Sequence, residues 1–162
     1  MKTRCHIATL LALVAALAQA QSKPSPLVGA WRVVEVTMTG PNGSTISSPQ
    51  PGLMLFTEKY YSIMRVEGDH PRPELPRDQS KATAADFRAV WDPLNAHSGA
   101  YEIYGDKITM RRIVTKNPIA MRPGNYAVYS FKITGDTLVI TDVRVTGSPA
   151  VNPTTVKLTR LE

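Results

Sequence analysis

The chain contains 162 residues, of which 43% are hydrophobic and 20% charged, and its formal net charge is +6. This length supports one domain with a single core, and the composition argues against a chain that is disordered throughout. The cations form no stripe and no motif with interleaved aromatic residues, so we expect no nucleic-acid partner.

The first 20 residues have the three parts of a cleavable secretory signal: Lys2 and Arg4, an apolar run over 7–17, and Ala-Gln-Ala over 18–20. The run is about half the ~20 residues that a membrane span requires, so we expect no stable membrane insertion. We expect a periplasmic or secreted protein that begins at Gln21. Cleavage removes Cys5, the only cysteine, and leaves 17 Lys+Arg against 13 Asp+Glu, a net charge of +4.

After the signal peptide (1–20) and a proline-containing lead-in (21–27), one domain is predicted over 28–162. Its first strand, over 29–39, is rich in valine. Gly29 lets the backbone pass close to a neighbour, and Trp31 supplies a large apolar plug whose indole N–H needs a partner. The Gly-Pro-Asn-Gly run that follows is typical of a turn.

A hairpin is predicted next, over 53–57 and 60–67, and a proline-rich connector over 68–81 leads to the one predicted helix, over 83–94. Thr83 and Asp86 have the spacing of a capping box. The apolar residues of the helix share one face: Phe87, Val90, Trp91 and Leu94. This face either packs into the core or forms a lid that reaches a ligand through Phe87 or Trp91.

The rest of the chain alternates strands with turns. Strands are predicted over 99–104, 107–115, 124–134, 137–146 and 152–161, and Gly-Asp pairs at 105–106 and 135–136 are typical of tight hairpin turns. The total is eight strands, a number that suits closure of a meander into a barrel without exposed edges. We predict an all-β fold, an eight-stranded up-and-down antiparallel barrel with one short α-helix as cap or lid.

The order and spacing of five segments resemble the bacterial lipocalin-like domain family, a calycin-type β-barrel. They are LVGAWRVVEV at 27–36, PGLMLFTEKYYS at 51–62, SGAYEIYGDKI at 98–108, GDTL at 135–138 and VKLTRL at 156–161. The resemblance implies a barrel that binds a small apolar or amphipathic molecule. It also implies that Arg160, near the end of the last strand, packs over Trp31. We expect this contact, with Gly29, to be structural.

Strand alternation predicts the residues that face the interior. The candidate ligand-binding residues are Glu35, Tyr101, Met110, Arg112, Tyr129 and Phe131. The buried charges have a structural explanation: either Glu35 or Asp142 pairs with Arg112, or each charged side chain extends out at a barrel mouth. Alternatively, these polar groups hold a carboxylate or hydroxyl at one end of an otherwise apolar ligand.

Two other classes of function stay open. We assign no catalytic residues, but an isomerase or cyclase could use Glu35 with a tyrosine or with His97 for acid–base chemistry. His70 and His97 lack an acidic ligand pattern, so we expect no metal and no other cofactor. An interaction module is the third alternative, because an apolar outward stripe of Val34, Val36 and Met38 would suit a docked helix or a homodimer contact.

Overall fold

The computed structural model of the protein describes residues 24–145 and 147–162. The predicted signal peptide (1–20), its cleavage site and the start of the lead-in lie outside the described residues. Eight strands form the main sheet: β1 (Gly29–Met38), β3 (Gly52–Phe56), β4 (Tyr60–Val66), β5 (Leu94–Tyr104), β6 (Lys107–Thr115), β7 (Ala127–Thr134), β8 (Thr137–Val145) and β10 (Thr154–Arg160).

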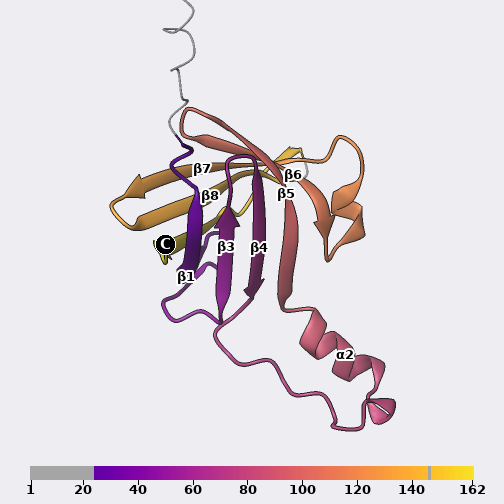
Figure 1. The fold of residues 1–162 in the computed structure, drawn as a ribbon. Helices are drawn as coiled ribbons and strands as arrows, with labels where there is room; N and C mark the ends of the chain where they lie inside the picture. Colours follow the sequence, from indigo (N-terminus) through magenta and orange to yellow (C-terminus); the bar gives the residue numbers. More distant parts are fainter. Residues whose placement is uncertain (1–23, 146) are drawn as a thin grey trace, which may run out of the picture.

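These strands form a closed antiparallel barrel, as predicted. Each strand pairs with the next one along the chain, and β10 closes the sheet by pairing with both β8 and β1. In Figure 1, β1, β3, β4 and β5 run side by side, and β7 and β8 cross behind them. Two short strands, β2 (Ser44–Ile46) and β9 (Ser148–Pro149), extend the pairing of β1 and β8.

Strand β1 shows both the predicted alternation and where it fails. Trp31 and Val33 are buried and Arg32 between them is exposed. The register against β10 then shifts between Val33 and Glu35, so that Val36 is buried and Glu35 lies opposite the exposed Lys157. Because one extra residue reverses the faces of a strand, the predicted inward position of Glu35 is wrong. The predicted outward stripe is wrong as well, since Val36 is its central member.

Trp31 and Arg160 meet at one end of the barrel, which we call the closed end. The two residues are opposite each other in the β1–β10 register, and the Arg160 guanidinium lies 4.0 Å from the indole centroid. The Trp31 indole N–H donates to the Leu27 carbonyl at 2.8 Å. Arg160 also donates to the carbonyls of Val28, at 2.8 Å, and Pro26, at 3.1 Å. The expected contact between Trp31 and Arg160 is therefore present.

Gly29 makes this closed end possible. Its φ is +131°, and a Cβ there would overlap the Glu162 carbonyl and lie 2.8 Å from Nη1 of Arg160. The backbone of β1 can thus approach the chain's last residues only with glycine at this position.

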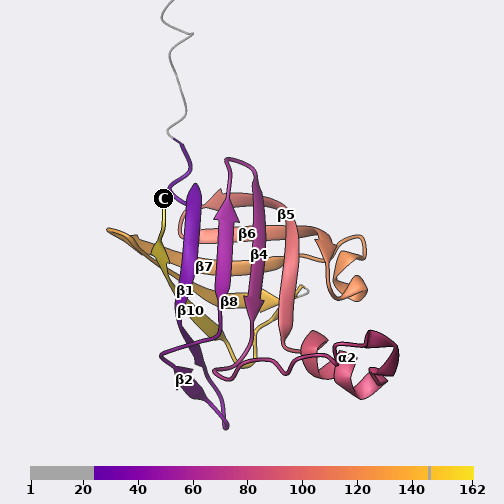
Figure 2. The ribbon, with the colours of Figure 1, turned by 60° about the horizontal axis from the view of Figure 1, so that its bottom comes forward.

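The helix α2 (Ala84–Trp91) has the predicted capping box, with the Thr83 hydroxyl accepting from the Asp86 N–H and the Asp86 carboxylate accepting from the Thr83 N–H. It contains no buried residue. Phe87 and Trp91 are 46% and 54% exposed, and the helix projects beyond the ends of the strands in both views (Figures 1 and 2). The interpretation that its apolar face packs into the core is therefore wrong.

Strand β5 begins five residues earlier than predicted, at Leu94. Pro93 lacks the N–H that a continuing helix would need, and residues 94–98 pair with β4 instead. This pairing makes residues 94–98, of which only Leu94 was predicted as helix, part of the barrel wall, and it places His97 in the interior.

Among the described residues, no helix has the length and apolar character needed to cross a bilayer.

Candidate functional site

The barrel is filled at the closed end and hollow toward the other end, which we call the open end. The closed half contains the large core residues Leu27, Trp31, Phe56, Tyr101, Ile108, Leu138 and Leu158. Beyond them lies a cavity of about 180 Å³. Its lining comprises Met54, Ile63, Arg65, Asn95, His97, Met110, Arg112, Tyr129, Ile140, Asp142, Val145, Thr154 and Val156.

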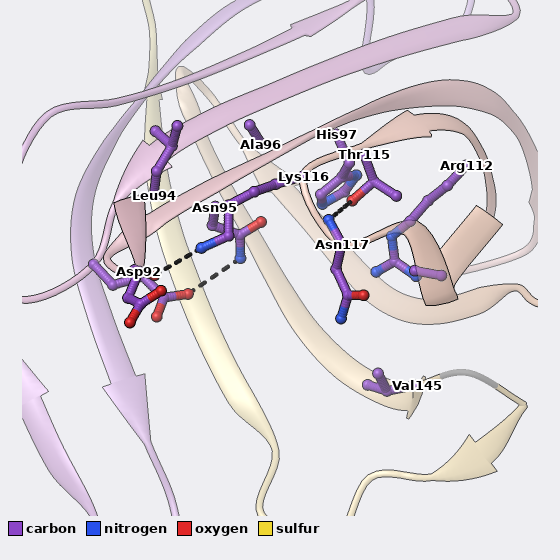
Figure 3. A pocket seen from close by; sticks show the side chains of 12 residues that line it. Asp92, Leu94, Asn95, Ala96, His97, Arg112, Thr115, Lys116, Asn117 and Val145 are labelled. Atoms are coloured by element: carbon purple, nitrogen blue, oxygen red, sulfur yellow. Dashed lines mark hydrogen bonds between the residues drawn. The ribbon is translucent and has the colours of Figure 1, made fainter. Parts of the chain in front are cut away.

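This interior cavity has an outer neighbour at the open end. A wider depression of about 330 Å³ shares Asn95, His97, Arg112 and Val145 with it. Figure 3 shows this depression, with His97 and Arg112 on one side of it and Val145 on another. The four shared residues therefore line the passage between the barrel interior and its surroundings.

One buried polar pair lies at the boundary of the cavity. Nδ1 of His97 and the Tyr61 hydroxyl share a hydrogen bond at 3.2 Å, and their rings meet edge to face. Burial, followed by the charges of Arg112 and Arg65, lowers the pKa of His97 from 6.5 to about 4. Burial likewise raises the pKa of Tyr61. Both groups are therefore neutral at physiological pH.

Three charged side chains line the cavity: Arg65 on β4, Arg112 on β6 and Asp142 on β8. Asp142 accepts a hydrogen bond from the Thr154 N–H at 3.1 Å. Within residues 24–145 and 147–162, no ion pair joins Asp142 to Arg112. The predicted pairing of Arg112 with Asp142 or Glu35 is therefore wrong.

The predicted ligand-binding and lid residues fall into four places, of which the outer face holds Glu35. Met110, Arg112 and Tyr129 line the cavity together. Tyr101 and Phe131 do not line it: Tyr101 belongs to the buried core cluster and Phe131 packs against that cluster. The Tyr101 hydroxyl donates to the Thr57 carbonyl at 2.6 Å. Phe87 and Trp91, the predicted lid residues, line neither cavity described above.

Glu35 lies on the outer face of the barrel, as described for β1, whereas His97 faces the interior. The acid–base pair proposed from the sequence is thus not assembled. In the part of the chain that the structure describes, no three His, Cys, Asp or Glu side chains gather as a metal site.

Several cavity residues were missed from the sequence. Arg65 follows Tyr61 and Ile63 at every second position of β4, so strand alternation alone would have placed it inside. Asn95 and His97 carried no such signal, because they lie between the predicted helix over 83–94 and the predicted strand over 99–104.

A closed eight-stranded antiparallel barrel with a cavity at one end is the architecture of small-molecule-binding barrels of the lipocalin type. The chain belongs to the lipocalin-like domain family, whose model matches residues 28–155. A search of the curated proteins returned no match. The crystal structure of an uncharacterized protein from Bacteroides eggerthii DSM 20697 is similar, with 8% sequence identity, a TM-score of 0.43, and coverage of 83% of this chain and 98% of that one.

Proposed function

We propose that the protein binds a small amphipathic molecule in the cavity at the open end of the barrel. The observation that carries this proposal is the composition of the lining. Apolar side chains from β3, β4, β6, β8 and β10 face one another across the cavity, and the polar side chains of Asn95, His97 and Arg112 reach the passage. Apolar walls with a few convergent polar groups are typical of ligand sites.

The volume limits the size of the ligand. About 180 Å³ lies below the ~300–1,000 Å³ of drug-sized sites. A bound molecule is therefore compact, or it extends through the passage into the outer depression.

Methionine methyl groups give a direct test by NMR. Met54 and Met110 line the cavity and are 5% and 1% exposed, whereas Met64 and Met121 lie outside it and are 59% and 44% exposed. We expect octan-1-ol and octanoate, titrated into methyl-labelled protein, to shift the signals of Met54 and Met110 and to leave those of Met64 and Met121 in place. Equal shifts at all four methionines would indicate surface adsorption and would contradict the proposal.

Tryptophan fluorescence is a poor reporter of ligand binding here, because Trp31 lies at the closed end and Trp91 on the exposed helix.

A blocking variant adds a matched control. Val156 lines the cavity, and its neighbour Lys157 is exposed on the outer face of the same strand. Val156→Phe is expected to abolish the methyl shifts and Lys157→Phe to preserve them, because only the first places a ring in the cavity.

We also propose that the protein is exported. This proposal rests on the signal-like segment 1–20, which lies outside the described residues. Expression of the full chain in a bacterium, followed by fractionation and N-terminal sequencing, tests it. The expected product begins at Gln21 in the periplasm or medium, and an unprocessed cytoplasmic product would refute export.

A further inference from the structure

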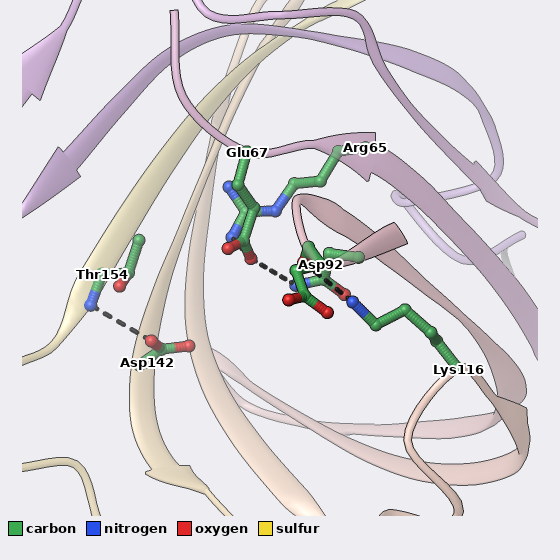
Figure 4. A network of polar contacts seen from close by, with 7 residues as sticks. Arg65, Glu67, Asp92, Lys116, Asp142 and Thr154 are labelled. Carbon is green, nitrogen blue, oxygen red and sulfur yellow. Dashed lines mark hydrogen bonds and ion pairs between the residues drawn. The ribbon is translucent and has the colours of Figure 1, made fainter. Parts of the chain in front are cut away.

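Two guanidinium groups face the cavity, and they differ in their partners. The Arg65 side chain is only 17% exposed, and its Nη2 lies 3.5 Å from the Glu67 carboxylate at the rim. Figure 4 shows Arg65 beside Glu67 and Asp142 turned toward Thr154. Arg112 lines both the cavity and its outer depression, yet among the described residues no carboxylate lies within 4.0 Å of its guanidinium.

Arg111, the next residue on β6, has the opposite character. It is exposed on the outer face and pairs with Glu102 at 3.0 Å. The outward arginine thus has a carboxylate partner within the protein, and the inward one has none there. A partly buried charge without an ion-pair partner is costly. The placement of Arg112 therefore favours an anionic ligand that enters the cavity and pairs with its guanidinium.

The groups around Arg112 suit such an anion. His97 carries no positive charge at neutral pH, so Arg65 and Arg112 supply the cations of the lining. The one carboxylate of the lining, Asp142, accepts a hydrogen bond from the Thr154 N–H. Tyr129 lines the same cavity, and its burial raises the pKa of its hydroxyl, which stays protonated and able to donate. The opposing wall is apolar, with Met54, Ile140 and Val156.

We propose that the ligand is a small organic monocarboxylate whose carboxylate binds the Arg112 guanidinium and whose apolar part lies against Met54, Met110 and Ile140. This inference rests on the proposed function, because it names the chemical class of the molecule in the same cavity. The planar guanidinium fork matches a carboxylate in two parallel hydrogen bonds. Inorganic phosphate shares the charge but has no part that could use the apolar wall.

The test compares three eight-carbon probes by isothermal titration calorimetry on the full chain: octanoate, octanamide and octylamine. We expect octanoate to bind at least about tenfold more tightly than octanamide, because hydrogen bonds to charged groups are roughly twice as strong as neutral ones. Octylamine, which is cationic, is expected to bind most weakly. Inorganic phosphate serves as a fourth probe, and we expect no detectable heat from it.

Variants then assign the effect to a residue. Arg112→Gln is expected to lower the affinity for octanoate at least about tenfold and to bring the ratio of acid to amide affinity close to one. Arg111→Gln is the matched control on the outer face, and it should leave both affinities within about twofold.

The outcomes separate this inference from the proposed function. Equal affinities for octanoate and octanamide, or an unchanged ratio in Arg112→Gln, would overturn the carboxylate inference and leave a neutral ligand for the cavity. If no probe shifts the Met54 and Met110 signals, both proposals fail.

A readout on the unmodified protein covers the case in which Arg112→Gln does not fold. A carboxylate bound beside Arg112 brings a negative charge near His97, which Tyr61, Arg65 and Arg112 surround. At neutral pH, where the probe is ionised, octanoate should therefore shift the ring signals of His97 in histidine NMR more than octanamide does. The signals of the exposed His70 are the internal control, and equal shifts of His97 with octanoate and octanamide would contradict the placement.

Discussion

Acid should weaken the fold through His97, and the structure sets the size of the effect. Burial, followed by Arg112 and Arg65, holds the pKa of His97 at about 4 in the folded protein, against 6.5 for an unperturbed histidine. The unfolded chain therefore binds a proton at a higher pH than the folded chain does. Stability is full above about pH 6.5, falls as the pH drops toward 4 and then levels off. With about 1.4 kcal/mol for each factor of ten in proton affinity, the loss between about pH 7.5 and about pH 4.5 is about 2–3 kcal/mol.

Urea denaturation of the wild type and of His97→Gln at both pH values measures this loss. Glutamine retains a hydrogen-bonding group for Tyr61 but does not titrate. The carboxylates titrate in both proteins, so the difference between the two stability profiles isolates His97. His70→Gln is the matched control, because the His70 side chain is 89% exposed. Parallel profiles for the wild type and His97→Gln across this pH range would refute the reasoning.

Three further substitutions test other parts of the barrel by urea denaturation. Arg160→Gln should lower the free energy of unfolding by about 2–3 kcal/mol, because it removes a cation–π contact and charge-assisted hydrogen bonds. Arg32→Gln, at an exposed position, should change it by less than about 0.5 kcal/mol, and equal effects would contradict the role given to Arg160. Gly99→Ala should lower the free energy of unfolding by at least about 2 kcal/mol, because a Cβ there would overlap the backbone carbonyl of Arg111. An unchanged free energy of unfolding would show that β5 and β6 can separate. Trp91→Ala should lower the free energy of unfolding by less than about 1 kcal/mol, because α2 contains no buried residue. A loss of ~3–5 kcal/mol, which is typical of a core tryptophan, would show that the helix packs on the barrel.

The fold was largely predictable from the sequence. Strands that are joined by a short turn, such as Gly105-Asp106, can pair only as antiparallel neighbours, so the turns restrict the possible topologies of the sheet. The contact between Trp31 and Arg160 came from family resemblance, and the structure explains it by placing the two residues opposite each other in the register.

The candidate site was only partly predictable, because strand alternation holds only between irregularities. Met110, Arg112 and Tyr129 follow the alternation and line the cavity. Glu35 lies just after the register shift of β1, and no local sequence signal marked the extra residue. His97 could not be placed, because Pro93 ends the helix earlier than the apolar pattern suggested. The pairing with β4 that decides its position depends on residues more than thirty positions away.

The contact of Arg160 with the start of β1 also bears on the order in which the barrel forms. The Arg160 guanidinium donates to the Val28 carbonyl across 132 positions of the chain, and among the described strands β10 alone joins β1 to β8. During synthesis, both of those strands emerge with one row of backbone groups unpaired until residues 154–160 follow. Closure is thus a late step of long sequence separation, which is slow for β-proteins. A chain that stops before β10 would retain two open edges able to join other chains, so premature termination favours association as well as loss of stability.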